Sequence, residues 1–195
     1  MKVLLVNTSE RTGGAAVACH RLLDALNKQG IEATMLVRDK QTDNPHVIAL
    51  RKPFYMKLCF LWERFIIWAN NLFSRKNLFT VSIANTGADI TRLPAFKEAD
   101  IIHLHWINQG MLSLTDIRRI IDSGKPIVWT MHDMWPFTGI CHYAGTCEKY
   151  TSHCEHCPIL YKGGKKDLSY QTFQKKEKTL KGSQIRFVTC SQWLG

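Results

Sequence analysis

The chain has 195 residues, of which 45% are hydrophobic and 22% are charged. These proportions are typical of a folded globular domain and exclude a largely disordered chain, and the length suits one well-buried domain better than two. Lys and Arg outnumber Asp and Glu by 26 to 16, a formal net charge of +10. That excess favours anionic partners, namely nucleic acid, a membrane surface or phosphorylated small molecules.

The first forty residues have the pattern of a βαβ unit. Residues 2–7 form a short apolar run that predicts a buried strand, and a turn-prone loop follows over 7–14. Residues 15–29 have helical apolar spacing and end before Gly30, a residue type that commonly stops helices. A second strand is predicted over 32–38, which completes the unit.

The alternation of strands and helices continues along the chain. We predict strands over 100–105, 126–131 and 184–190, and a helix over 112–122. Residues 191–194 resemble the first turn of a helix, with Ser191 placed as its N-cap. Such alternation predicts an α/β fold, a Rossmann-like parallel sheet with helices on both faces and without internal repeats.

An aromatic segment, residues 54–73, interrupts this alternation and is long enough to cross a membrane. Lys57, Glu63 and Arg64 lie near its middle, where charge is costly in a bilayer, so we reject a transmembrane helix. We favour a core helix packed on the sheet. The alternative is an amphipathic helix at a bilayer interface, with basic residues around it, and the two interpretations are compatible.

The chain opens with an apolar stretch, residues 3–6, that is too short for the core of a signal peptide. We therefore expect a cytoplasmic protein whose seven cysteines are mostly reduced.

A cysteine-rich insertion occupies residues 139–158. Its four cysteines follow the spacing C-x5-C-x6-C-x2-C: Cys141, Cys147, Cys154 and Cys157. Structural zinc is the leading interpretation, because C-x2-C is a common zinc knuckle, and free thiols and disulfides are the alternatives. Three further cysteines lie in apolar contexts that predict small core residues: Cys19, Cys59 and Cys190.

Three groups of residues are candidates for ligand contact. Gly13 and Gly14 precede the first predicted helix, where backbone N–H groups can approach a diphosphate, or simply form the turn. The dinucleotide fingerprint and the Walker lysine are absent. His103 and His105 share one face of the strand predicted over 100–105, and Trp106 follows it at the edge where open α/β sheets bind ligands. The alternative for both histidines is a structural role, with the rings satisfied by backbone carbonyls.

The third group is His132 and Asp133, at the end of the strand predicted over 126–131. A histidine there can donate a hydrogen bond to a hydroxyl group or a forming oxyanion. Asp133 either orients the His132 ring or caps the next turn.

Residues 162–181 carry seven lysines, opposed by Asp167 and Glu177. They indicate either a solvated helix face or a surface for an anion.

Several motifs in order resemble bacterial family 4 ("group 1") glycosyltransferases, the enzymes of polysaccharide and glycan assembly. They are residues 1–15, the run Ala-Asp-Ile-Ile-His-Leu-His-Trp at 99–106, and residues 126–139. Residues 188–194 resemble the last strand of that family's N-terminal domain and the helix start after it. The resemblance covers nearly the whole chain, whereas the cysteine insertion resembles one subgroup only.

The resemblance implies one half of a two-domain GT-B fold. Residues 1–195 match the N-terminal, acceptor-side domain, and the donor-binding domain with its E-x7-E motif is missing from them. We therefore expect these residues alone to be inactive. In the family, the glycine loop approaches the donor phosphates, which matches Gly13 and Gly14, and a histidine near the transferred sugar matches His132.

The implied reaction is transfer from a nucleotide sugar to a glycan or polyprenyl-linked acceptor. The anomeric configuration is retained, and no cofactor or D-x-D metal is needed. A polyprenyl-linked acceptor would suit peripheral contact with the inner face of the membrane. The rival hypothesis is a zinc-stabilised, basic nucleic-acid-binding module. We disfavour it, and expect no nucleic-acid partner, because no recognition helix or RNA-reading motif is present. The missing fingerprint also disfavours a Rossmann oxidoreductase.

Overall fold

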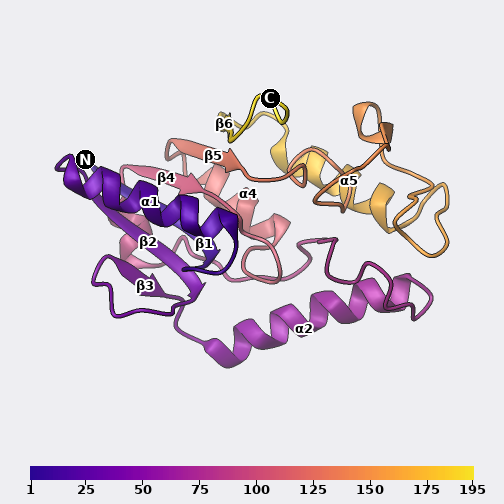
Figure 1. Ribbon diagram of the computed structural model, residues 1–195, viewed down its shortest axis with the longest axis horizontal. Helices are drawn as coiled ribbons and strands as arrows, with labels where there is room; N and C mark the ends of the chain where they lie inside the picture. Colours follow the sequence, from indigo (N-terminus) through magenta and orange to yellow (C-terminus); the bar gives the residue numbers. More distant parts are fainter.

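The computed structural model describes residues 1–195 and has a six-stranded, fully parallel sheet at its centre (Figure 1). The strand order is β3-β2-β1-β4-β5-β6. The strands are β1 (Lys2–Ser9), β2 (Glu32–Asp39), β3 (Val47–Ala49), β4 (Ile101–Leu104), β5 (Ile127–Met131) and β6 (Arg186–Thr189). This is the Rossmann order, in which the crossovers change direction between β1 and β4. The predicted Rossmann-like sheet is confirmed.

Helices cover both faces of the sheet, as predicted. They are α1 (Gly14–Lys28), α2 (Pro53–Asn70), α3 (Pro94–Glu98), α4 (Leu114–Asp122) and α5 (Leu168–Leu180). Cys19 and Leu23 of α1 pack in a core cluster on one face with alternate residues of β1 and β2. Phe96 of α3 and Ile117 of α4 belong to the larger cluster on the opposite face. Because both faces are covered, β1 has six consecutive buried residues rather than alternating ones.

Helix α4 begins two residues later than its apolar spacing predicts, because a capping box fixes its start. The Ser113 hydroxyl accepts a hydrogen bond from the Asp116 backbone N–H at 3.1 Å, and Asp116 Oδ2 accepts from the Ser113 N–H at 2.9 Å. These bonds satisfy two backbone donors that a helix start otherwise leaves unpaired.

At the sheet edges, one element was missed and one agrees with prediction. The three-residue strand β3 was not predicted, since a run that short carries no periodic signal. After Ser191 the chain forms a single turn, in which the Leu194 and Gly195 N–H groups donate to the Ser191 carbonyl oxygen at 3.3 Å, as in the first turn of a helix. The Ser191 hydroxyl still accepts a hydrogen bond from the Leu194 N–H at 3.3 Å, the contact expected of a cap.

Helix α2 occupies the aromatic segment and runs along the lower side of the molecule, away from the sheet (Figure 1). One of its faces is buried through Met56, Cys59 and Ile67, whereas its opposite face exposes large apolar side chains. The predicted core helix is therefore present on one face only. None of the helices is both long and apolar enough to cross a membrane.

The lysine-rich segment contains α5, and most of its lysines are exposed. Lys176 differs from the predicted solvated face because its side chain is buried. Its ammonium group donates hydrogen bonds to the carbonyl oxygens of Trp135 and Thr138, the latter at 3.0 Å, and lies 3.6 Å from the centre of the Trp135 ring. Burial lowers the pKa of Lys176 well below its usual value, against the charges of Cys141, Asp133 and Cys154, which act to raise it.

Candidate active site

A cleft of about 1210 Å³ opens at the carboxyl edge of the sheet. Its walls come from the loop after β1, the start of α1 and the segments that follow β4 and β5. It brings together several predicted site residues: Gly13, Gly14, Trp106, His132 and Asp133. His103 and His105 do not line it. The position agrees with the general rule that open α/β sheets bind ligands at the carboxyl ends of their strands.

Gly13 and Gly14 form an uncapped helix N-terminus in this cleft. Gly13 has φ 90° and ψ 163°, a conformation that side-chain-bearing residues rarely adopt. No side chain caps α1, and a Cβ atom added to either glycine would meet no atom within 4 Å. The first N–H groups of α1 are therefore available to an anion and lie at the positive end of the helix dipole.

Hydrogen bonds hold the glycine loop against the segment after β4. Thr8 Oγ1 donates to the carbonyl oxygens of Trp106 and Asn108, each at 3.0 Å, and Asn7 Oδ1 accepts from the Trp106 N–H at 2.9 Å. The loop therefore has a defined position relative to the residues across the cleft.

Glu10, which the sequence analysis did not identify, anchors the other side of the same loop. Its buried carboxylate accepts hydrogen bonds from the Thr42 N–H at 2.9 Å, from the Thr42 hydroxyl and from the Gln41 N–H. Burial alone would raise the pKa of Glu10, but these donors lower it below its usual value. The carboxylate thus stays ionised and ties the β1 loop to the β2 loop.

Asp133 does not hydrogen-bond to the ring of His132. Its carboxylate accepts from His142 Nδ1 at 2.6 Å, from Trp106 Nε1 at 2.8 Å and from the Trp135 N–H at 2.9 Å. Burial raises the pKa of Asp133, and the hydrogen bond and charge of His142 with the other two donors outweigh it, so the net pKa is lowered. Of the two roles predicted for Asp133, the contact with the Trp135 N–H is the capping of the next turn.

His142 is a cleft residue that sequence reasoning missed. Its Nε2 lies 3.1 Å from the Ser82 hydroxyl, and its ring centre is 5.4 Å from that of Trp106. With Asp133 these residues form one network along the wall of the cleft. His142 directly follows Cys141 within the cysteine insertion, so its only sequence signal was that it stands among possible metal ligands.

Three histidines form a row beneath the cleft. His103 Nε2 lies 2.8 Å from the Thr130 hydroxyl, and His105 Nδ1 lies 3.0 Å from His132 Nε2. The ring centres of His103 and His105 are 4.4 Å apart, and those of His105 and His132 are 5.2 Å apart. Only His132 reaches the cleft. His103 and His105 lie on the same face, as predicted, and His105 contacts His132 on the side away from the cleft.

Burial keeps this row neutral near pH 7. It lowers the pKa of His103 to about 4, with help from the charge of His132, and that of His105 to about 2, with help from both neighbours. The pKa of His132 is also lowered by burial, which outweighs the opposing charge of Asp133.

The hydrogen bonds of His105 favour one tautomer of His132. His105 Nε2 is buried without a partner. An orphaned N–H is rarer than an orphaned acceptor, so the proton of His105 belongs on Nδ1, from which it is donated to His132 Nε2. The proton of His132 is then on its Nδ1, the nitrogen left for a ligand.

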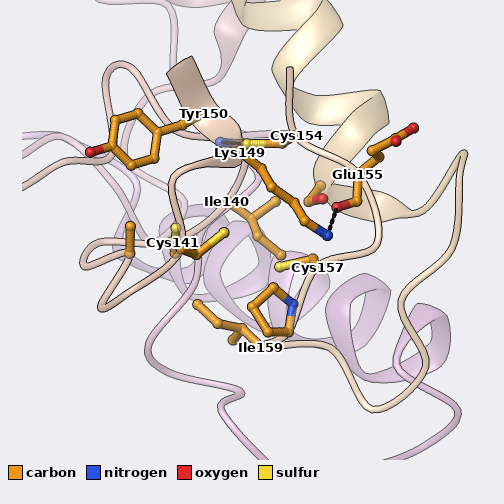
Figure 2. A pocket seen from close by; sticks show the side chains of 13 residues that line it. Ile140, Cys141, Lys149, Tyr150, Cys154, Glu155, Cys157 and Ile159 are labelled. Carbon is orange, nitrogen blue, oxygen red and sulfur yellow. Dashed lines mark hydrogen bonds between the residues drawn. The ribbon is translucent and has the colours of Figure 1, made fainter. Parts of the chain in front are cut away.

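The four insertion cysteines lie together, apart from this cleft. All four line a cavity of about 20 Å³, the size of a single water molecule (Figure 2). All seven cysteines are free, and in this conformation no three His, Cys, Asp or Glu side chains are spaced to hold a metal ion. Cys19 and Cys59 are buried as predicted. The prediction for Cys190 is wrong: it is exposed because it follows the edge strand β6.

The fold and the cleft define an α/β domain that presents its ligand site at the carboxyl edge of a parallel sheet. The family model of Glycosyltransferase Family 4 matches residues 12–193, and the chain belongs to that family. A protein of Escherichia coli (strain K12), described as a colanic acid biosynthesis glycosyl transferase, WcaC, is 28% identical over 99 residues. That alignment covers 49% of this chain and 23% of the relative's length. No solved structure matches the chain.

Proposed function

We propose that this chain forms the acceptor-side domain of a retaining glycosyltransferase that uses a nucleotide-sugar donor. The observation that carries the proposal is one cleft that holds both the uncapped N-terminus of α1 and the side chain of His132. The first can bind the charge of a diphosphate, and the second can hydrogen-bond to a sugar hydroxyl. Family membership supports this function over a nucleic-acid-binding module.

The helix N-terminus would stabilise the leaving group. When the bond between the sugar's anomeric carbon and the phosphate oxygen breaks, negative charge grows on the diphosphate. Backbone N–H groups already aimed at that position stabilise the charge without having to reorganise. In a retaining reaction the acceptor oxygen attaches to the face that the phosphate leaves, and the acceptor's proton passes to the departing phosphate oxygen.

His132 would act as a neutral hydrogen-bond donor through Nδ1–H. Its lowered pKa keeps the ring uncharged at neutral pH, and His105 fixes its tautomer. Asp133 is occupied by three donors and is therefore unsuited to act as a nucleophile or as a base for His132. It holds Trp106 and His142 in the wall of the cleft.

We further propose a glycan or polyprenyl-linked acceptor in polysaccharide assembly, with α2 resting on the membrane that carries it. The relative's description, colanic acid biosynthesis, supports the pathway class. Helix α2 supports the membrane contact through an exposed apolar face that includes Phe54, Leu58, Leu61, Trp62 and Phe65. A helix with such a face and basic neighbours suits the interface of an anionic bilayer.

The test is a transfer assay with the complete enzyme, including its donor-binding domain. We expect release of a nucleoside diphosphate from a nucleotide sugar in the presence of a lipid-linked glycan. NMR of the product should show the anomeric configuration of the donor. A product of inverted configuration would refute retention. Absence of transfer from every common nucleotide sugar, with a folded protein, would refute the transferase.

A further inference from the structure

We propose that Cys141, Cys147, Cys154 and Cys157 together bind one Zn²⁺ ion as a structural site. The site is separate from sugar transfer, since none of these cysteines lines the cleft that contains His132. Its role would be to fix the insertion that carries His142 into the wall of that cleft.

The first supporting observation is that the four side chains surround one small space. Figure 2 shows Cys141, Cys154 and Cys157 arranged round the same cavity, with the hydrocarbon of Ile140 and Ile159 beside them. Cys141 is held there by a β-bridge to Val81. Four sulfurs that converge from different parts of an insertion form the ligand set of a closed structural zinc site.

The second observation is a backbone N–H group aimed at one of the sulfurs. The Gly139 N–H donates to Cys154 Sγ at 3.1 Å. A Cβ on Gly139 would come within 3.0 Å of Cys154 Cβ and 2.6 Å of the Ser169 carbonyl oxygen, so only glycine allows this approach. Burial raises the pKa values of Cys141, Cys154 and Cys157, and the Gly139 N–H donor partly opposes this at Cys154 by favouring the thiolate, the form that binds metal.

The third observation is the buried ammonium group of Lys176. Burial lowers the pKa of Lys176 well below its usual value, whereas the charges of Cys141, Asp133 and Cys154 act to raise it. Zn²⁺ with four thiolates carries a net charge of −2, which a dry site must compensate. A protonated Lys176 and the Gly139 N–H donor would supply positive charge beside the ligands, the kind of support that surrounds metal sites in general.

The sulfurs must draw closer together to bind the ion, because their present spacing is wider than a metal site requires. The insertion can adjust, since residues 142–167 contain only one short 3₁₀ helix, Lys149–Thr151. Zn–S bonds are about 2.3 Å long. Binding converts four thiols and Zn²⁺ into the tetrathiolate complex and releases four protons. The binding free energy then orders the insertion.

Elemental analysis of the complete protein, purified without chelator, tests the site directly. We expect about one zinc per chain, the stoichiometry of a four-ligand site. Cys154→Ser and Cys157→Ser should each lose most of the zinc. The matched control is Cys190→Ser, which removes an exposed cysteine outside the insertion and should keep the full amount. Less than a tenth of an equivalent of zinc in the wild type, or equal zinc in all variants, would overturn the proposal.

Cobalt substitution of the wild type covers the case in which a cysteine variant fails to fold. We expect one equivalent of Co²⁺ to give the intense sulfur-to-metal charge-transfer and d–d bands of tetrahedral thiolate coordination. Zn²⁺ should bleach these bands. A weak octahedral spectrum, or a thiol count showing disulfides in the insertion of freshly purified protein, would overturn the proposal.

Discussion

His132 and Asp133 are neighbours in sequence but take part in different hydrogen-bond networks. A residue at the end of β5 and the residue after it diverge, so His132 turns back to His105 while Asp133 reaches His142. A pair of this kind invites the interpretation of a catalytic dyad. The contacts instead support the proposal that His132 donates a hydrogen bond to the ligand and that Asp133 positions its neighbours.

Removing the His132 ring should reduce turnover more than substrate affinity. In the complete enzyme we expect His132→Ala to lower kcat by roughly tenfold to a thousandfold, the range for loss of one positioned donor. The KM for the donor should change little. Steady-state kinetics, with circular dichroism as the check on folding, would measure both.

The matched control for this prediction is His153→Ala. His153 is an exposed histidine of the insertion, and its ring lies outside the cleft. It should retain wild-type kinetics. Wild-type kcat in His132→Ala would reduce that ring to a structural element.

Gly13 should matter for donor binding because its conformation places the first N–H groups of α1 in the cleft. We expect Gly13→Ala to raise the Kd of the donor, because φ 90° is strained for alanine and the loop would shift its N–H groups. Gly30→Ala is the matched control. It also has a positive φ, 76°, and open space for a Cβ, but it lies after α1, far from the cleft. Calorimetric titration with the nucleoside diphosphate should show weaker binding for Gly13→Ala only, and equal weakening in both variants would contradict the prediction.

Among single residues, the sequence identified those whose chemistry depends on lying at the end of a strand or at the start of a helix. Gly13, Gly14 and His132 could be placed because each adjoins a strand or helix whose boundary the apolar pattern predicts. Glu10 and His142 could not, since their roles depend on contacts with Thr42 and Ser82 across loops. No local pattern encodes such contacts.

Helix α2 buries two charged residues and exposes large apolar ones, the reverse of the usual distribution. Its buried face contains Glu63, whose carboxylate accepts hydrogen bonds from the Ile83 and Ala84 N–H groups at 2.8 and 2.9 Å. Arg64 Nη1 donates to the Val81 carbonyl at 3.0 Å. These bonds fix residues 81–84, which include the Ser82 partner of His142. Glu63 and Arg64, the charged residues that argue against a membrane span, thus hold the wall of the cleft in place.

The outer face of α2 should bind anionic membranes. Between residues 51 and 80 the only acidic residue is the buried Glu63, whereas five basic residues are exposed: Arg51, Lys52, Lys57, Arg75 and Lys76. We expect Trp62→Ser with Phe65→Ser to weaken binding to anionic vesicles about tenfold or more, since burying one such side chain contributes about 1.5–3 kcal/mol. Vesicle co-sedimentation would measure the change.

Trp193→Ser provides the control, because Trp193 is as exposed as the α2 aromatics but lies at the other end of the chain. It should bind like the wild type. Equal binding to neutral and anionic vesicles would exclude the contribution of the basic residues, and no binding to either would exclude the membrane contact.

The strands β1, β2, β4, β5 and β6 could be predicted to within about two residues, because a sheet covered on both faces needs continuous apolar runs. The orientation of α2 could not. Its sequence is apolar nearly all round, so the choice of buried face depends on where Glu63 and Arg64 find partners. The cysteine insertion is similar, since sequence spacing does not determine how closely its sulfurs converge.

Across the whole molecule, the buried histidine row links the stability of the sheet to pH. His103 on β4 and His105 just after it lie between the sheet and the cleft, and both have strongly lowered pKa values. An unfolded histidine has a pKa of about 6.5. Between pH 6.5 and the folded values, the unfolded chain therefore binds more protons than the folded one, which lowers the free energy of unfolding as the pH falls.

Each of these histidines should contribute a slope of about 1.4 kcal/mol per pH unit below pH 6, because one proton is taken up on unfolding. Above about pH 6.5 both states are neutral and the contribution is constant.

His103→Gln keeps a side chain that can hydrogen-bond to Thr130 but removes the titration. We expect urea denaturation between pH 7 and pH 4.5 to give a slope smaller by one proton for this variant, so that its stability approaches that of the wild type in acid. Comparing the two proteins cancels the shared carboxylates and any metal release. His46→Gln, on an exposed loop, should run parallel to the wild type. A His103→Gln curve that also runs parallel would show that His103 is as easily protonated in the folded protein as in the unfolded chain.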